Sequence, residues 1–299
     1  MSIAERRAAK GCLPPVVIES VVEDPESIRA IARANCPYFH ENMPPDVIWP
    51  LWSAPWAADG KPLLDAAAPL LHHEGFVSAA AKMCGSDRVV PQGMYINLST
   101  PSRAQPVTHT DSPEFRGVDH THAPAWFRQV MGVSGLFEGE RITTITAVSW
   151  FFSGERGFYR YWPAGRGEES IRHEAMWNTA VVGDNTFMHH KVERTGPKDM
   201  GPPEMSIAAF LDRDGDDWLI VEDGRTLARY ADEHVRLSLT WTAKVYDEDA
   251  GTARITLDEV HARMADAIGD DFAASSTEEL FTKAARKQLV PRWPGFLPG

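Results

Sequence analysis

The chain has 299 residues, of which 43% are hydrophobic and 24% charged, a composition typical of a soluble globular protein. Its formal net charge of −12 argues against a nucleic-acid partner and an anionic membrane surface, because no basic stripe is available to neutralise phosphates. No apolar run is long enough to cross a bilayer, the N-terminus lacks a secretion signal, and the three cysteines lack zinc-site spacing, so we expect a cytoplasmic protein.

The N-terminal third reads as mostly helical. Residues 15–22 are rich in valine and isoleucine and predict a strand. Asp24 and Pro25 supply the N-cap and the first turn of a helix that we expect to reach about Ala34. Residues 38–56 are rich in proline and tryptophan and predict an irregular segment that covers the core. Two short helices are expected at residues 62–72 and 76–83, the second ended by Gly85.

From residue 88 the pattern changes to β. Strands are expected at residues 88–100, 106–111, 205–211, 218–221 and 235–246, with a short helix at 126–133. Turn residues between strand patterns predict two hairpins, one joining 141–152 to 157–162 and one joining 178–182 to 186–192.

Two helices with capping boxes close the chain. Thr256 with Glu259 begins the first of these helices, and Ser276 with Glu279 begins the second. The fold class that follows is mainly β with helical flanks, with a double-stranded β-helix or jelly-roll core. We expect a single domain over residues 1–299, with the core at about 88–247, an N-terminal helical region at 1–87 and C-terminal helices at 248–299.

The triplet His109-Thr110-Asp111 is the strongest candidate for chemistry. Alternate side chains of a strand share a face, so His109 and Asp111 point the same way and can bind one cation. With a second histidine they would form the two-histidine, one-carboxylate set of non-haem Fe(II) oxygenases. The triplet alone is weak, because a strand-end histidine before a turn-forming aspartate explains it equally well. Two rival ligand pairs, His72 with Glu74 and His120 with His122, are better explained as a helix-end charge cluster and a solvated loop.

His189 and His190 are the candidates for the third ligand, and strand alternation lets only one of them face inward. Around them, the stretch Asp184-Asn185-Thr-Phe-Met-His-His190-Lys-Val resembles the distal-histidine segment of the Fe(II)/2-oxoglutarate-dependent dioxygenases. That resemblance implies that His190 binds the metal.

The segment Arg236-Leu-Ser238 is similar to the Arg-x-Ser strand of the same family, in which the guanidinium binds the far carboxylate of 2-oxoglutarate. The separation between His190 and Arg236 is longer than in the family, so an insertion is expected between them. Arg213 and Arg194 are the alternatives to Arg236. Tyr95 and Asn97, on the preceding strand, correspond to positions where the family often places an extra contact to 2-oxoglutarate.

The resemblance implies an enzyme in which His109, Asp111 and His190 hold Fe(II), with 2-oxoglutarate and O₂ as cosubstrates. Such an enzyme oxidises a C–H bond of a small molecule by hydroxylation, desaturation or ring formation. Because the carboxylate of Asp111 is present, halogenation is not expected. Phe115 and Arg116 follow the triplet and are candidate substrate contacts, which would suit a small substrate with a carboxylate and an apolar body. Two alternatives remain: a cupin-like metalloenzyme that does not use 2-oxoglutarate, and a non-catalytic jelly-roll binding protein.

Overall fold

The computed structural model describes residues 2–8, 11–40, 49–102, 107–247, 252, 254–269 and 272–293. Its helices are α1 (Ile3–Ala8), α2 (Pro25–Ala34), α3 (Ala68–Leu71), α4 (Glu74–Cys84), α5 (Ala125–Ser134), α6 (Leu257–Ile268) and α7 (Lys283–Arg292), with 3-10 turns η1 (Asp65–Ala67), η2 (Asp232–His234) and η3 (Thr277–Phe281). Its strands are β1 (Val16–Ile18), β2 (Leu51–Ala58), β3 (Lys61–Pro62), β4 (Val89–Ser99), β5 (Glu114–Phe115), β6 (Arg141–Phe151), β7 (Tyr159–Trp162), β8 (Ile171–His173), β9 (Trp177–Gly183), β10 (His189–Val192), β11 (Phe210–Asp214), β12 (Asp217–Glu222), β13 (Arg225–Tyr230) and β14 (Arg236–Val245).

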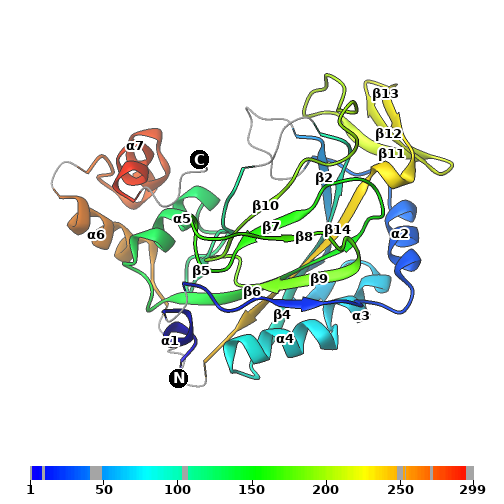
Figure 1. The fold of residues 1–299 in the computed structure, drawn as a ribbon. Helices are drawn as coiled ribbons and strands as arrows, with labels where there is room; N and C mark the ends of the chain where they lie inside the picture. The colour runs from blue at the N-terminus through cyan, green and yellow to red at the C-terminus, as the bar shows by residue number, and fades with distance from the viewer. Residues whose placement is uncertain are drawn as a thin grey trace.

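A large antiparallel sheet runs in the order β1-β9-β6-β14-β4-β2-β3, with β5 paired to β6 (Figure 1). Strand β14 lies between β4 and β6, and Ser238 pairs with Asn97 on one side and with Trp150 on the other. A small sheet has the order β10-β7-β8. The segment around His109 lies beside β10, because the backbones of His109 and His190 form an antiparallel bridge.

The chain alternates between these two sheets. It passes from β4 in the large sheet to residues 107–111 beside the small one, then to β6, to β7 and β8, to β9, to β10 and to β14. This is the jelly-roll connectivity. The predicted fold class, mainly β with helical flanks around a jelly-roll core, is therefore confirmed. Pro106, at the start of the predicted 106–111 strand, lies outside the described residues.

Both predicted hairpins are wrong. Strand β6 already pairs with β14 on one edge and β9 on the other, so no edge is left for β7. Strand β9 likewise pairs with β6 and β1, and β10 joins the small sheet instead. The turn residues between these strands mark crossings from one sheet to the other. Turn signals report where the chain reverses, not which strand it pairs with next.

The prediction of an irregular segment at residues 38–56 is wrong for residues 51–56, which belong to strand β2. Strand β2 pairs with β4 and buries Trp52 and Trp56, which are 0% and 1% exposed. Residues 41–48 of the predicted segment lie outside the described residues. The stretch between His190 and Arg236, where an insertion is expected, contains a separate three-stranded sheet, β11-β12-β13, which contacts the N-terminal region through a bridge between Tyr38 and Leu211.

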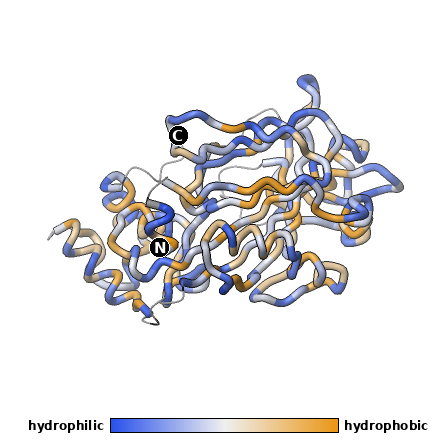
Figure 2. The backbone as a smooth tube through the Cα atoms, turned by 60° about the horizontal axis from the view of Figure 1, so that its bottom comes forward, coloured by the Kyte–Doolittle hydropathy of each residue, from blue (hydrophilic) through white to orange (hydrophobic). Residues whose placement is uncertain are grey.

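Alternate side chains of β14 point to opposite faces of the large sheet, one set into the hydrophobic core and the other into a cavity. Leu237, Leu239 and Trp241 are at most 1% exposed and belong to the main hydrophobic cluster. The Trp241 indole donates to the carbonyl of Leu71 at 2.8 Å, so α3 and α4 cover this face of the sheet, as Figure 1 shows. The intervening side chains face the small sheet across the molecule. In Figure 2 the hydrophobic residues gather along the strands in the middle of the molecule.

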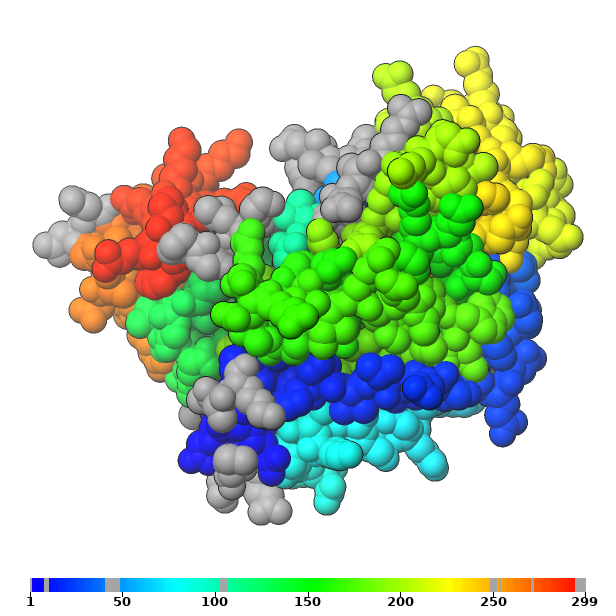
Figure 3. Space-filling view, in the orientation of Figure 1, coloured from blue at the N-terminus to red at the C-terminus, as the bar shows by residue number. Residues whose placement is uncertain are grey.

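A second hydrophobic cluster joins α5 to the C-terminal helices, which Figure 3 shows in orange and red at one end of the molecule. The capping box of Thr256 and Glu259 is present at the start of α6. The predicted box at Ser276 is wrong, because Ser276 makes no side-chain capping bond and Thr282 instead caps α7, accepting from the amide of Ala285. Within the described part of the chain, no helix combines the length and apolar character of a membrane span.

Candidate metal centre and its cavity

Three side chains converge where the segment of His109 meets β10. One ligand atom each from His109, Asp111 and His190 lies within 4.8 Å of the other two. The nearest pair is His190 Nε2 and Asp111 Oδ1 at 3.4 Å, and the two imidazole ring centres are 4.5 Å apart. Two imidazoles and a carboxylate form the facial ligand set that binds Fe(II) with positions left open.

Backbone carbonyls fix the tautomer of both histidines. Nδ1 of His109 lies 2.9 Å from the carbonyl of Val107, and Nδ1 of His190 lies 3.0 Å from that of Met188. A carbonyl only accepts, so each Nδ1 carries a proton, and Nε2 is the nitrogen of each ring that is left to bind a metal in place of a proton. Each histidine therefore presents the nitrogen that a metal requires.

Asp111 is held as a carboxylate. Desolvation opposes its charge, but the interactions with His190 outweigh this and lower the pKa of Asp111 to about 2. Thr146 on β6 donates to its second oxygen, Oδ2, at 3.2 Å. Desolvation in the cavity wall lowers the pKa of His109, so its imidazole is neutral near pH 7. For His190, burial is outweighed by the hydrogen bond to Asp111, which raises its pKa.

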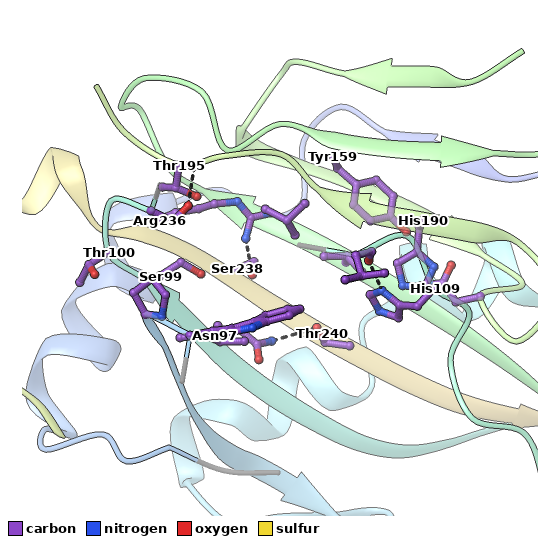
Figure 4. A pocket seen from close by; sticks show the side chains of 18 of the residues that line it. Asn97, Ser99, Thr100, His109, Tyr159, His190, Thr195, Arg236, Ser238 and Thr240 are labelled. Atoms are coloured by element: carbon purple, nitrogen blue, oxygen red, sulfur yellow. Dashed lines mark hydrogen bonds between the residues drawn. The ribbon is translucent and has the colours of Figure 1, made fainter. Parts of the chain in front are cut away.

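The three residues line one part of a cavity of about 660 Å³ between the two sheets (Figure 4). The large sheet contributes polar residues from β4, β6 and β14, and the small sheet contributes Tyr159 and Val192. The apolar lining is completed by Val107, Val148, Leu51 and Trp49. A deep site between packed sheets is where a small ligand can be held away from bulk water.

Arg236 faces the same cavity from β14 and is 2% exposed. Its Nε donates to the carbonyl of Gly157 at 2.8 Å and its Nη1 to Ser238 Oγ at 3.1 Å. Within the described ranges, Nη2 is buried without a hydrogen-bond partner. Burial lowers the pKa of Arg236 to about 9. A buried cation with a vacant donor is a site that an anion would stabilise.

The structure separates the alternatives that the sequence left open. His189 is not in the converging group, since β10 alternation turns it away from His190. Arg213 lies on an exposed part of β11, and Arg194 donates to backbone carbonyls including that of Ser102 at 2.8 Å. Of the two residues expected on β4, Asn97 lines the cavity and donates to Thr240 at 3.1 Å. Tyr95 shares its face but is not part of the lining.

The structure places the two expected substrate contacts, Phe115 and Arg116, outside this cavity. Phe115 is 1% exposed and packs in the cluster of α5 and the C-terminal helices. Arg116 donates to the carbonyl of Gly139 on the surface. The reason is that β5 pairs with the start of β6, which leads the chain away from the cavity directly after Asp111.

Several cavity residues were not predicted from the sequence. Tyr159 lies on β7 with its ring centre 5.7 Å from that of His190, and burial raises its pKa well above the usual value, so it remains a hydroxyl donor. Thr146, Asn185 and Thr240 also line the cavity. Strand alternation could have placed Thr240 beside Ser238, but nothing local indicates that β7 faces β14.

The sequence matches no protein-family model, and no curated protein sequence matches it. Among solved structures, the chain is similar to a 2OG-Fe(II) oxygenase family oxidoreductase from Burkholderia pseudomallei, with 11% identity and a TM-score of 0.45, covering 85% of this chain and 92% of the other. It is similar to a prolyl-4-hydroxylase from Pseudomonas putida, with 14% identity, a TM-score of 0.42 and coverage of 82% and 98%. It is also similar to HygX from Streptomyces hygroscopicus, solved with nickel, 2-oxoglutarate and hygromycin B, with 11% identity, a TM-score of 0.42 and coverage of 84% and 96%. The assignment of the site rests on the geometry of this chain.

Proposed function

We propose that this protein is an Fe(II)- and 2-oxoglutarate-dependent oxygenase that oxidises a C–H bond of a small molecule. The observation that carries the proposal is the convergence of His109, Asp111 and His190 in a cavity that also holds the buried cation of Arg236. A metal-binding face and a vacant guanidinium donor together fit a cosubstrate with a chelating end and a distant carboxylate.

In this proposal the Nε2 atoms of His109 and His190 and the carboxylate of Asp111 hold the metal. Arg236 and Ser238 bind the far carboxylate of 2-oxoglutarate, which gives the buried guanidinium the counter-ion that it lacks among the described residues. Asn97 and Thr240 lie beside them and supply neutral hydrogen-bonding groups.

With Fe(II) bound by these three residues, O₂ would be the oxidant: 2-oxoglutarate would give up two electrons and leave as succinate and CO₂, and the substrate C–H bond would give up the other two. The part of the protein is to fix the ligands and exclude water. The side chains of Val107, Val148 and Val192 form an apolar wall near the metal-binding residues and would keep the reacting C–H group out of bulk water.

The reaction that we infer is hydroxylation, desaturation or ring formation, because Asp111 occupies the position that a halide would need. A substrate recognised by Arg116 is not part of the proposal, since this arginine lies outside the cavity. The volume of about 660 Å³ leaves room for a small substrate next to the cosubstrate.

The test is a succinate assay with Fe(II), ascorbate and 2-oxoglutarate on the wild type, His109→Ala and Arg236→Met, with Arg213→Met as the matched control. We expect His109→Ala to abolish metal-dependent succinate formation. Arg236→Met should raise KM for 2-oxoglutarate by about 100-fold, since a charge-assisted bidentate contact contributes roughly 3 kcal/mol. Arg213→Met should behave as the wild type.

Other outcomes would point to other functions. Stoichiometric metal binding without any succinate, and without an effect of Arg236→Met on ligand binding, would favour a metalloenzyme that does not use 2-oxoglutarate. Failure to bind Fe(II) under anaerobic titration would leave a non-catalytic binding protein.

A further inference from the structure

The turn between β9 and β10, residues 184–188, contacts two of the three metal-binding residues. The carbonyl of Asn185 accepts from the amide of Asp111 at 2.8 Å, and the carbonyl of Met188 accepts from the His190 imidazole at 3.0 Å. His109 is tied to His190 by two backbone hydrogen bonds of 2.9 and 3.0 Å. The placement of all three ligands therefore depends on this turn.

Asp184 holds the turn together from inside. It is 0% exposed, and its carbonyl accepts from the amides of Phe187 at 2.9 Å and Met188 at 2.7 Å. Its carboxylate accepts from Thr186 Oγ1 at 3.3 Å and from the amide of Leu13 at 3.4 Å. A buried carboxylate needs a counter-ion in addition to these neutral donors.

Arg7, on the N-terminal helix α1 and 177 residues before Asp184 in the sequence, provides that counter-ion. Its Nε lies 2.7 Å from Asp184 Oδ2, and its Nη2 lies 3.4 Å from Oδ1 and 3.4 Å from Thr143 Oγ1 on β6. In Figure 1, α1 lies below β5 and β6. Arg7 is not part of the cavity lining, and it contacts the turn through Asp184 and strand β6 through Thr143.

The aromatic ring of Phe187 is held between two guanidinium groups. The Arg7 and Arg141 groups lie 4.1 and 3.9 Å from the ring centre. Arg141 also approaches the carbonyl of Thr186 at 3.4 Å. Cation–π contacts on both faces of one ring would limit the motion of the turn beyond what its backbone hydrogen bonds achieve.

We propose that Arg7 and Asp184 are positioning residues of the metal centre, holding the 184–188 turn so that Asp111 and His190 meet. This proposal rests on the proposed function, because it presumes that the three converging side chains bind a metal. Groups that orient metal ligands from behind typically change metal affinity by about 10- to 100-fold when removed. The N-terminal helix would thus control metal affinity without contacting metal or substrate.

The test measures Co(II) affinity of the full chain by calorimetric titration, together with the visible absorption of the bound Co(II). Arg7→Met removes the charge and keeps the aliphatic length, but it leaves Asp184 buried without its cation and could unfold the protein. The double variant Arg7→Met with Asp184→Asn leaves no buried unpaired charge, and its asparagine can accept from the amide of Leu13 through Oδ1 and donate to Thr186 Oγ1 through Nδ2. We expect the dissociation constant of the double variant to rise at least about 10-fold, with an altered Co(II) spectrum.

Arg29→Met is the matched control. Arg29 is also a buried arginine, 4% exposed, that pairs with an aspartate, Asp232, but it lies on α2 at the opposite end of the molecule in Figure 1. It should lower thermal stability and leave Co(II) affinity and the spectrum unchanged. Equal loss of affinity in Arg29→Met would show general destabilisation and overturn the proposal.

Wild-type affinity and spectrum in the double variant would overturn the positioning role alone. Absence of a Co(II) site in the wild type would overturn the metal centre itself and the positioning role with it. The two failures are therefore distinguishable.

Discussion

At the scale of single residues, the metal centre depends on which of two adjacent histidines faces inward. His190 is 7% exposed and its imidazole reaches Asp111, whereas the neighbouring His189 lies on the other face of β10. The backbone of His190 also forms an antiparallel β-bridge with that of His109, so two of the three ligands are joined by backbone hydrogen bonds. Replacing His190 should therefore weaken metal binding much more than replacing its neighbour His189.

We predict that His190→Ala weakens Co(II) binding by more than about 100-fold, because a ligand is lost rather than reoriented. His189→Ala, on the same strand, should stay within about twofold of the wild type. Titration of both variants with Co(II) distinguishes them. If His189→Ala lost Co(II) affinity and His190→Ala bound Co(II) like the wild type, the metal ligand would be His189 and our assignment of His190 would be wrong.

Gly157 leaves room for the side chain of Arg236, which a larger residue at this position would displace. Its φ is +66°, and a Cβ there would lie 2.8 Å from Cδ of Arg236, whose Nε donates to the Gly157 carbonyl. We predict that Gly157→Ala displaces the guanidinium and raises KM for 2-oxoglutarate about 10-fold, or about 1.4 kcal/mol, with Co(II) affinity unchanged.

Gly224→Ala separates this effect from backbone strain. Gly224 has a similar φ of +71° but open space around its Cβ position, so both variants share the conformational cost, roughly 1 kcal/mol. Steady-state kinetics with varied 2-oxoglutarate should show the change in KM for Gly157→Ala alone. An equal change in both variants would refute the contact with Arg236 as its cause.

At the scale of elements, α2 and the inserted sheet meet at one carboxylate immediately before β14. Asp232 accepts from the Trp218 indole at 2.7 Å and from Arg29 Nε at 2.9 Å, and Arg33 also pairs with it. Desolvation opposes its charge, but these donors outweigh desolvation and lower its pKa. Three segments distant in sequence are thus joined at one end of the strand that carries Arg236.

We predict that Asp232→Asn lowers the free energy of unfolding by about 2 kcal/mol at pH 7, since it breaks a largely buried charged cluster. The folded-state pKa is below the unfolded value of about 3.9, so this stability is present above pH 4 and is lost as the pH falls through the folded pKa. The difference between variant and wild type should therefore shrink in acid. Denaturant unfolding at pH 7 and pH 3 measures it.

Asp214→Asn is the control for this change. Asp214 also pairs with an arginine, Arg229, but its side chain is 66% exposed, so its loss should cost less than about 0.5 kcal/mol at either pH. A pH-independent loss in Asp232→Asn would mean that the carboxylate charge is not what joins α2 to the insertion.

At the scale of the whole molecule, the sequence predicts features set by neighbouring residues, such as strand alternation and helix caps. It does not predict contacts between segments that are distant in the sequence. Alternation along one strand is enough to pair His109 with Asp111, and the capping pattern is enough to start α2 at Pro25. The choice of His190 and Arg236 came from a resemblance in short motifs, and both line the cavity.

The rest depends on which sheet each strand joins. The two hairpin predictions were wrong because β6 and β9 each pair with another strand of the large sheet on both edges. The residues of a turn do not indicate this pairing. Phe115 and Arg116 lie outside the cavity because β5 pairs with the start of β6. Tyr159 and the Arg7–Asp184 pair were missed because they meet the site only once distant segments pack together.

The central place of β14 has a consequence for biosynthesis. This strand is the shared neighbour of β4 and β6, yet it leaves the ribosome after all the other strands that the structure describes. Until then a nascent chain carries all three metal-binding side chains beside two unpaired strand edges, which are prone to self-association. A premature stop before residue 236 would yield a product that keeps His109, Asp111 and His190 but lacks both the strand that forms one wall of their cavity and the buried cation of Arg236.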